Sequence, residues 1–386
     1  MSVKIPFNKP FIVGKELYYI AESVMSGKTS GDGTFTKKCN ELMENKFGAK
    51  QVLLTTSCTT ALEMSAILAG IGEGDEVILP SYTFVSTANA FYLRGAKLKF
   101  VDIRKDTLNI DENLIENAIT EKTKAVVPVH YSGVACEMDA INKIAKKYDL
   151  TVIEDAAQGV NSRYKGSYLG TIGDLGAFSF HETKNYSCGE GGALITSNEA
   201  YYERAEIIRE KGTNRSKFYR GEVDKYTWVD IGSSYLPSDL LAAFLYAQLE
   251  QMDHITEKRK QIYNLYFEAL KPLRNEGFIE LPFIPRECET NYHMFYILLK
   301  NENERQAMIK HLEESGINSV FHYVPLHSSP VGRRLGYKSG DLEVTEDISG
   351  RLLRLPFYYD LDLEGILYVC QCIREYFVGG LKFRLG

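Results

Sequence analysis

The stretch that decides the fold is Glu76 to Val101, in which an apolar run, a helical pattern and a second apolar run follow one another. Glu76-Val77-Ile78-Leu79 is typical of a buried strand that ends at Pro80. Ser86 to Leu93 has the pattern of a helix, and Leu98-Lys99-Phe100-Val101 that of the next strand. Two strands joined through a helix form a βαβ unit, whose strands lie parallel in one sheet.

The same alternation continues on both sides of this unit. Strands are expected at Val52–Thr55, Ala125–Val129, Val152–Ile153, Ala177–Phe180 and Gly192–Thr196, and helices at Thr59–Ala69 and Met138–Tyr148. The sequence therefore predicts the α/β class, with a mainly parallel sheet covered by helices on both faces.

After about residue 240 the pattern changes to long helices and isolated strands. A helix is expected over Ser238–Leu270, leading to a smaller α+β domain with strands at Met294–Leu299 and Ser319–Tyr323 and helices at Arg305–Ser315 and Leu363–Phe377. We place a large α/β domain at residues 1–250 and a small C-terminal domain at 251–386, and expect Gly379–Gly386 to be a frayed tail.

Composition excludes several classes of protein. The 386 residues are 44% hydrophobic and 25% charged, as in globular proteins that form a sizeable core. The net charge of −6 argues against nucleic acid as a partner. No apolar stretch predicts a membrane span or a secretory signal, and the seven dispersed cysteines predict neither disulfides nor a metal site. A cytoplasmic protein is expected.

Four segments place polar or aromatic side chains at carboxyl ends of the expected strands, where parallel sheets bind ligands. In Thr55–Leu62, hydroxyls and the N–H groups of a helix N-terminus suit a phosphate, although Ser and Thr are also ordinary caps. In Pro80–Phe84, an aromatic ring is either a platform for a planar cofactor or part of the core.

The other two segments contain an acid and, 29 residues later, a lysine. Asp155 could keep a pyridine nitrogen protonated and Gln158 could bind a ring hydroxyl, or Asp155 could simply cap a helix. In Ser179–Asn185, Ser179 could bind phosphate and Lys184 could attach covalently to an aldehyde, or Lys184 could be a surface lysine. An acid and an amine in this order are the minimum equipment of pyridoxal phosphate chemistry.

Taken together, these segments resemble the DegT/DnrJ-type sugar nucleotide aminotransferases. The resemblance extends from Pro6-Phe7-Asn8 to the last helix and is carried by residues 56–62, 76–87, 154–158 and 179–185. It implies a fold-type I, aspartate-aminotransferase-like enzyme that uses pyridoxal 5'-phosphate. A branch of the family that acts as dehydratases has a His in place of the lysine, and Lys184 argues against that branch.

The resemblance also implies roles for single residues. Lys184 would be the catalytic lysine that bonds to the cofactor, and Asp155 and Gln158 would bind the ring nitrogen and hydroxyl. Thr59, Thr60 and Ser179 would hold the phosphate, and Phe84 would cover the ring. Two positions depart from the family pattern, Cys58 where many members have Gly and Ser234 where many have an Asn that reaches the neighbouring subunit.

Residues 81–91, 205–216 and 224–236 are similar to those members of the family that form dTDP-4-amino-4,6-dideoxygalactose. This implies transfer of an amino group from glutamate, giving 2-oxoglutarate, to C4 of dTDP-4-keto-6-deoxyglucose. Amination at C3, a gluco-configured product, and a pyridoxal-phosphate-binding protein without activity are the alternatives. No GxGxxG follows the first strand, which argues against a dinucleotide-binding oxidoreductase.

Substrate contacts and partners follow from weaker signals. Lys211, Arg215, Lys217 and Arg220 crowd one loop, which could meet a nucleotide diphosphate or be a solvated loop. His327, in a segment that resembles the border of the sugar pocket, is either a sugar contact or a structural His. The resemblance implies a homodimer.

Overall fold

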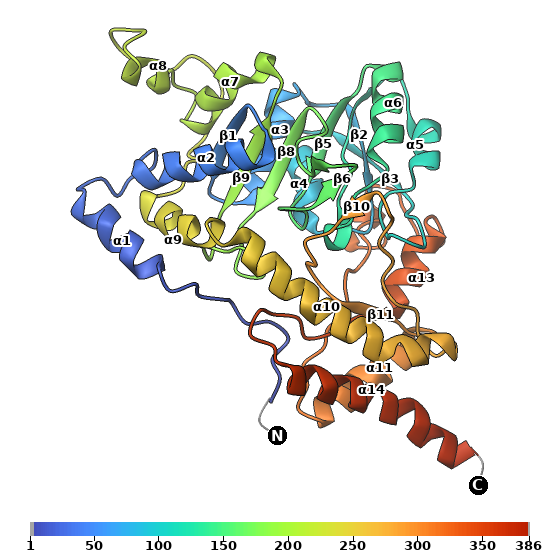
Figure 1. The fold of residues 1–386 in the computed structure, drawn as a ribbon. Coiled ribbons are helices and arrows are strands. Elements are labelled where there is room, and N and C mark those ends of the chain that lie inside the picture. Colours follow the sequence, from blue (N-terminus) through green and yellow to red (C-terminus); the bar gives the residue numbers. More distant parts are fainter. Residues whose placement is uncertain (1–3, 385–386) are drawn as a thin grey trace.

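The computed structural model describes residues 4–384, and its central element is a seven-stranded sheet (Figure 1). In spatial order the strands are β1 (Gln51–Thr55), β9 (Gly192–Thr196), β8 (Leu175–Ser179), β5 (Thr151–Asp155), β4 (Thr123–Val126), β2 (Glu76–Pro80) and β3 (Lys97–Val101). Strand β9 is antiparallel to both of its neighbours, and all other neighbouring pairs are parallel. The predicted mainly parallel sheet is confirmed.

Helices cover both faces of this sheet, and alternate side chains of one strand enter different hydrophobic clusters. Val52 and Leu54 of β1 lie in the cluster that also contains Phe47, whereas Leu53 lies in the cluster on the opposite face. One face is covered by α3 (Cys58–Leu68), α4 (Val85–Tyr92) and α7 (Glu199–Arg209), and the other by α2 (Thr34–Phe47), α5 (Glu112–Ala118), α6 (Met138–Tyr148) and α9 (Asp239–Leu249).

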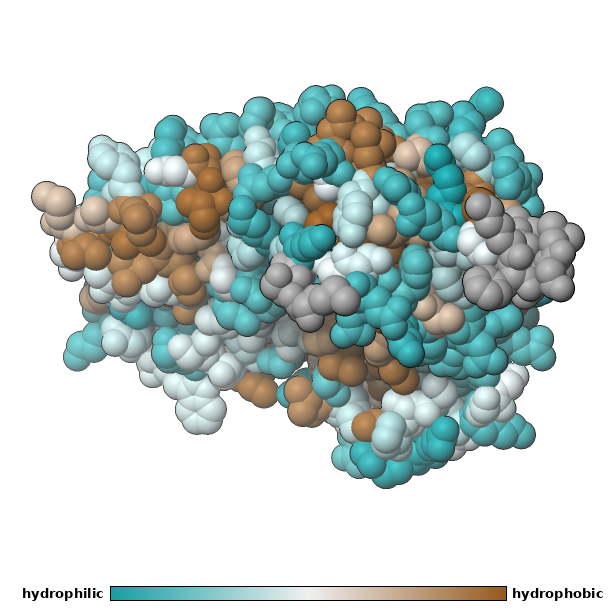
Figure 2. All heavy atoms as spheres, turned by 90° about the horizontal axis from the view of Figure 1, so that it is seen from below, coloured by the Kyte–Doolittle hydropathy of each residue, from teal (hydrophilic) through white to brown (hydrophobic). Residues whose placement is uncertain are grey.

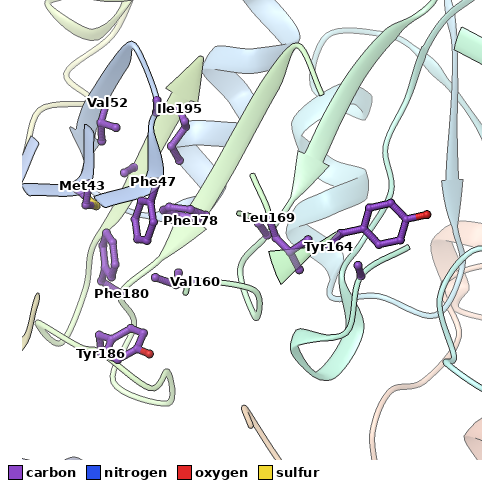
Figure 3. Close-up of a cluster of buried hydrophobic side chains, with 14 of the residues drawn as sticks. Met43, Phe47, Val52, Val160, Tyr164, Leu169, Phe178, Phe180, Tyr186 and Ile195 are labelled. Carbon is purple, nitrogen blue, oxygen red and sulfur yellow. The ribbon is translucent and has the colours of Figure 1, made fainter. Parts of the chain in front are cut away.

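Aromatic rings fill the second of these two layers. Figure 3 shows Phe47 and Phe178 side by side, with Phe180 and Tyr186 farther along the same layer. The rings of Phe47 and Phe178 meet edge to face at 5.3 Å, which is a favourable geometry for a buried pair. This layer extends to α1 (Glu16–Met25), which packs along α9.

A second, smaller unit follows α9 in the chain. It contains α10 (Met252–Asn275), β11 (Tyr296–Leu298), α11 (Glu302–Glu314), α12 (Pro330–Arg334), α13 (Glu343–Arg351), β12 (Leu352–Arg354) and α14 (Leu363–Arg384), with β11 and β12 paired antiparallel. Short elements complete the fold: a three-stranded sheet of β6 (Arg163–Tyr164), β7 (Ser167–Tyr168) and β10 (Cys288–Glu289), and a 3-10 turn η1 at Tyr131–Gly133. Helix α8 (Arg215–Tyr219) lies next to α7, at the end of the molecule away from the small unit (Figure 1). No helix within residues 4–384 combines the length and apolar content needed to cross a bilayer.

The structure differs from the helix that was predicted across residue 250, while the division of the chain into domains there stays a prediction. The helix predicted over Ser238–Leu270 is two helices, because α9 ends at Leu249 and α10 begins at Met252. Two segments also pack in the unit to which a division at residue 250 does not assign them. Ile5 packs in the core of the small unit and bridges to Ile317. Cys288 packs in a hydrophobic cluster of the sheet. The first residues of the chain therefore belong with the small unit.

Three local predictions for the small unit also differ from the structure. Residues 294–299 contribute only the three-residue strand β11, and of residues 319–323 only Val320 pairs, as a single bridge to Arg354. The expected frayed tail is largely helical, because α14 continues to Arg384 after Phe377 stacks on Phe278 at 4.9 Å. Residues 385 and 386 of that tail lie outside the described part of the chain.

A buried carboxylate ties strand β5 to the segment that follows β7. Glu154 is fully buried, and its two oxygens accept hydrogen bonds from His130 Nε2 at 2.8 Å and from the backbone N–H groups of Gly170, Ile172 and Gly173 at 2.6 to 2.8 Å. His130 Nδ1 accepts from Cys136 N, so its proton is on Nε2 and faces Glu154. The Glu154 carboxylate is therefore the acceptor for all four of these buried donors.

We therefore expect Glu154→Gln to lower the free energy of unfolding by about 3 kcal/mol, because the amide NH₂ would face donors instead of accepting from them. Chemical denaturation followed by circular dichroism measures this. Glu116→Gln is the matched control, since Glu116 is exposed and pairs with Lys147 at the surface, and it should lower the free energy of unfolding far less than Glu154→Gln does. Equal effects of the two substitutions would contradict the role given to Glu154.

Candidate active site at the carboxyl edge of the sheet

The four polar segments meet at one edge of the sheet, around a cavity of about 520 Å³. They follow β1, β2, β5 and β8, which all point in the same direction. From these segments, the cavity is lined by Ser57, Cys58, Thr59, Thr83, Phe84, Ser86, Thr87, Asp155, Ala157, Gln158, Ser179, His181, Thr183 and Lys184. The structure thus brings together residues that are more than 120 positions apart in the sequence.

The wall after β1 is the first turn of α3. Ser57 caps this helix by accepting from Thr60 N at 3.1 Å, and Thr60 Oγ1 accepts from Ser57 N in return. Cys58 and Thr59 are left to line the cavity, and their N–H groups lie in the first turn, where no helical acceptor exists. Gly192 of β9 allows this approach, because a Cβ there would lie 2.3 Å from the Ser57 carbonyl carbon.

The wall after β5 presents one carboxylate and one amide. Asp155 is 5% exposed, and its oxygens accept from Thr87 Oγ1 at 2.6 Å and from Ala157 N at 3.1 Å. Gln158 accepts from Ser132 N at 2.6 Å and donates to Tyr323 Oη at 3.1 Å. Both side chains are held in one orientation before any ligand binds.

Lys184 lies in the connection between the antiparallel strands β8 and β9. Backbone hydrogen bonds from Phe180 N to Gly191 O and from Glu182 N to Gly189 O keep this connection at the sheet edge. Within residues 4–384, the Lys184 amine has no hydrogen-bond or ion-pair partner, and it faces the cavity. Burial lowers the pKa of this amine below its ordinary value, while Cys58 and Asp155 act in the opposite direction.

The opposite wall comes from residues that the sequence did not single out. His293, His322, Tyr323, Arg354 and Phe357 reach the cavity from the small unit, and Phe7 and Asn8 from the start of the chain. His293 donates from Nδ1 to Asn185 Oδ1, because the Asn185 amide nitrogen is used by Asn291 O; its Nε2 therefore lacks a proton. Burial also lowers the pKa of His293, which keeps the imidazole neutral.

Some sequence signal for this wall existed. Arg354 interrupts the apolar run Leu352-Leu353-Arg354-Leu355, and a charge inside a buried strand requires an explanation. His293 stands in the same way next to the apolar run that becomes β11. Neither feature of the sequence predicts which other residues of the cavity Arg354 or His293 contacts.

The remaining predicted cofactor residues fall into two groups. Ser179 is buried and lines the cavity, and Phe84 lines it while remaining 56% exposed at the start of α4, with its ring 6.3 Å from that of Tyr323. Thr60, in contrast, is not among the lining residues, since its hydroxyl closes the helix cap. The structure places Thr60 behind the phosphate-binding turn that was predicted, and a direct contact stays a prediction.

The two predicted substrate residues do not reach the cavity. His327 is fully buried, with Nδ1 bonded to Ser81 Oγ at 2.7 Å and Nε2 to Glu346 Oε1 at 2.9 Å, so both ring nitrogens have protein partners, and a contact with the sugar stays a prediction. Arg215 is outside the cavity and contacts Tyr219 and Glu210. The basic loop around it is neutralised by acids of α7 and its neighbours, since Lys217 pairs with Glu203 and Arg220 with Glu206 and Glu222.

The described residues also bear on metal chemistry. From residue 4 to residue 384, no group of three or more His, Cys, Asp or Glu side chains is placed to hold a metal ion. All seven cysteines are free thiols and buried. The cavity itself presents an amine, a carboxylate, hydroxyls, imidazoles, a thiol and a guanidinium.

Known proteins of similar sequence indicate the same kind of site. Residues 11–374 match the DegT/DnrJ/EryC1/StrS aminotransferase family. GDP-perosamine synthase of Escherichia coli O157:H7 is 33% identical over 378 residues, covering 97% of this chain and 98% of that protein. The spore coat polysaccharide biosynthesis protein SpsC of Bacillus subtilis is 34% identical over 380 residues, covering 96% of each.

Among solved structures, the PLP-form of the putative sugar aminotransferase Spr1654 from Streptococcus pneumoniae superposes with a TM-score of 0.88 at 26% identity. The superposition covers 95% of this chain and 97% of that one. The likeness therefore includes both the sheet and the small unit, and with them both walls of the cavity.

The lowered pKa of Lys184 can be measured directly. Only a neutral amine attacks an aldehyde, so reductive methylation of Lys184 by formaldehyde and borohydride should reach half its maximal rate at a lower pH than for an ordinary lysine, whose pKa is about 10.4. Peptide mass spectrometry after short exposures gives the rate at each pH. A synthetic peptide of residues 179–190 is the control, and the same midpoint in peptide and protein would contradict the effect of burial.

Proposed function

Because the chain belongs to the DegT/DnrJ/EryC1/StrS aminotransferase family, we propose that it transfers the amino group of glutamate to C4 of dTDP-4-keto-6-deoxyglucose, giving dTDP-4-amino-4,6-dideoxygalactose. The protein is a sugar aminotransferase that depends on pyridoxal phosphate. The observation that supports catalysis is the unpartnered Lys184 amine, which faces a cavity shared with the buried carboxylate of Asp155. A protein that only bound the cofactor would not need an amine with a lowered pKa.

The lining residues fit pyridoxal phosphate. Thr59 and Ser179 supply hydroxyls, and the first turn of α3 supplies N–H groups and the positive end of a helix, as a phosphate requires. Asp155 would hold the ring nitrogen, and Gln158 would exchange its bond with Tyr323 for one to the ring hydroxyl. Phe84 would lie over the ring. When bound, the cofactor accepts the electron pair that is released as a C–H bond of the substrate breaks.

Lys184 and Asp155 would have separate roles in the proposed reaction. Lys184 Nζ would take the proton from the α-carbon of the amino acid and deliver it to C4′ of the bound cofactor, so one amine would serve as covalent anchor and as acid and base. Burial lowers its pKa and increases the fraction of neutral amine available for this at neutral pH. Asp155 would keep the ring nitrogen of the cofactor protonated, and Thr87 Oγ1 and Ala157 N hold that carboxylate in place.

The choice of sugar is supported by similarity of sequence alone. Residues 81–91, 205–216 and 224–236 resemble family members that form the 4-amino-4,6-dideoxygalactose nucleotide. Amination at C3 and a product of gluco configuration are the alternatives, and they differ only in which carbon, and which face of it, receives the amine. Within the cavity, His293 Nε2 is a neutral acceptor suited to a sugar hydroxyl or to the incoming amine.

Product analysis tests this reaction. Incubation of the holoenzyme with dTDP-4-keto-6-deoxyglucose and L-glutamate should give one new amino sugar nucleotide, whose proton NMR couplings show an axial amine at C4. The same incubation with Lys184→Ala should give no product, while that variant still binds pyridoxal phosphate without a covalent bond. A C3-amino or equatorial product would correct the substrate proposal, and turnover by Lys184→Ala would overturn the mechanism.

We also propose that two copies of the chain form a homodimer through the surface around α1. Leu17, Tyr18, Val24 and Met25 of this helix are all more than half exposed, with Met25 at 86%. Figure 2 shows hydrophobic atoms gathered on the side of the molecule where α1 lies in Figure 1. An apolar patch of this kind on a globular protein marks an interface.

Charge placed on this patch should separate the copies. Wild-type protein is expected at twice 43.7 kDa in light scattering after gel filtration, and a Leu17→Asp, Met25→Asp double variant at or near 43.7 kDa. Leu363→Asp is the control, because Leu363 is an exposed leucine at the start of α14 in the small unit, and it should leave the mass unchanged. A monomeric wild-type protein would refute the dimer.

A further inference from the structure

Asn185, the residue after Lys184, joins the connection between β8 and β9 to the small unit. Its side chain is buried and does not line the cavity. The amide nitrogen donates to the carbonyl of Asn291 at 2.8 Å, and Oδ1 accepts from Nδ1 of His293 at 3.0 Å. One short side chain therefore contacts two residues that lie 106 and 108 positions later in the chain.

The segment that Asn185 contacts is itself fixed to the sheet. Asn291 donates through its side chain to the carbonyls of Gln158 and Val160, both at 2.8 Å, and its backbone N–H donates to Ser162 Oγ at 2.9 Å. These bonds hold Asn291 against the chain that follows β5. The carbonyl that Asn185 uses as an acceptor therefore has a fixed position.

Arg259 of α10 holds the same segment by its backbone. Its Nε donates to the carbonyl of Tyr292 at 3.0 Å, and its Nη2 donates to that of His293 at 2.6 Å. Tyr292 has a φ of 53°, a left-handed conformation that is costly for an aromatic residue. Such a conformation persists only where the surrounding contacts determine it. Contacts outside the cavity therefore determine how His293 enters the cavity.

We propose that Asn185 is a positioning residue, which directs the Lys184 amine into the cavity and determines which nitrogen of His293 carries the proton. The proposal rests on the proposed aminotransferase function, in which the Lys184 amine moves the proton. The N–H of Lys184 donates to the carbonyl of His181 at 2.9 Å, so the backbone is held before the lysine by this turn and after it by the Asn185 amide. The lysine side chain then moves while its backbone stays in place.

The acceptor end of the same amide acts on His293. A neutral imidazole carries one proton, and the hydrogen bond at one ring nitrogen decides the state of the other. Because Asn185 Oδ1 accepts from Nδ1, Nε2 stays an acceptor, and the ring lines the cavity. Loss of Asn185 would leave both tautomers open, and Nε2 would then be a donor in part of the molecules.

A purely structural link between the two units is the alternative, and Tyr186 already provides one. Its ring is buried, and its hydroxyl is bonded to Thr256 Oγ1 of α10. One anchor fixes how far the connection lies from the small unit, and a second anchor at the next residue fixes its rotation. Asn185 is the anchor next to Lys184, where rotation would turn the amine away from the cavity.

The tautomer of His293 can be measured without turnover. In the full chain labelled with 15N-histidine, the ring shifts of His293 should show a protonated Nδ1 and a bare Nε2, and the signal is assigned by its loss in His293→Gln. Asn185→Leu, which removes both bonds, should give a mixture of tautomers. Asn185→Asp, which keeps the acceptor for Nδ1 and loses the donor to Asn291, should keep the wild-type tautomer.

Reductive methylation before cofactor is added reports on Lys184. Burial lowers the pKa of this amine, so an amine that leaves the cavity should regain an ordinary pKa of about 10.4. The pH of half-maximal rate should therefore rise in Asn185→Leu. The titratable and charged groups nearest Lys184, which are Cys58, Asp155 and Arg354, are unchanged by this substitution.

Turnover of the holoenzyme with L-glutamate and the sugar nucleotide gives the third measurement. In Asn185→Leu, kcat should fall roughly 10- to 100-fold, as expected when a reacting group is displaced by about 1 Å. KM for either substrate should change less than about threefold, because no group that binds substrate is removed. Asn185→Ala, which brings no apolar branch against the polar partners, gives the same three measurements if Asn185→Leu does not fold.

Asn142→Leu is the matched control. Asn142 is a half-buried residue of α6 whose amide donates to the carbonyl of Ile172, outside the cavity. This variant should keep the tautomer, the methylation midpoint and kcat of wild type. A wild-type tautomer or a wild-type midpoint in Asn185→Leu would overturn the proposal and leave Asn185 a structural link. If wild type transfers no amine from L-glutamate, the proposed function fails, and the tautomer and the midpoint still decide the role of Asn185.

Discussion

The site depends on the direction of one strand. Strand β9 is antiparallel to both β1 and β8, so β1 and β8 point the same way and the short connection from β8 to β9 stays at their common carboxyl edge. Lys184 lies in that connection, while the first turn of α3 follows β1 at the same edge. A parallel β9 would have required a crossover from one end of the sheet to the other, and the lysine could not then have faced Asp155 and the α3 turn.

Buried polar groups in this protein fall into two kinds, and the difference separates stability from function. Glu154 and His327 are fully buried with every accessible bond made, so they hold segments together and have no capacity left for a ligand. Lys184, Arg354 and the Nε2 of His293 face the cavity without partners among the described residues. Unsatisfied groups of this kind are costly in a core, and their concentration around one cavity is what marks it as a site for a charged, hydroxylated ligand.

The sequence predicted the sheet wall well and the other wall hardly at all. The strand at residues 192–196 and the helix at 138–148 agree with the structure residue for residue, because their apolar patterns are strong and their ends are marked. Asp155, Ser179 and Lys184 were found because each lies at or just after the carboxyl end of a predicted strand, and strand direction alone brings such residues together. His293, Arg354 and Phe7 could not be found in this way, since their proximity depends on how the small unit packs. The partners of His327 could not be predicted for the same reason, because Ser81 and Glu346 are distant from it in sequence.

These two origins imply a division of roles between the walls. The sheet wall consists of groups placed by local sequence next to strand ends, and those groups match the cofactor. The wall of the small unit is placed by tertiary packing, including the bridge from Ile5 to Ile317 that carries Phe7 over Arg354. Substitutions in the second wall can therefore change which donor or sugar is accepted while leaving the cofactor site intact. The first residues of the chain, assigned by sequence to the large domain, thus reach the cavity because they are anchored on the small unit.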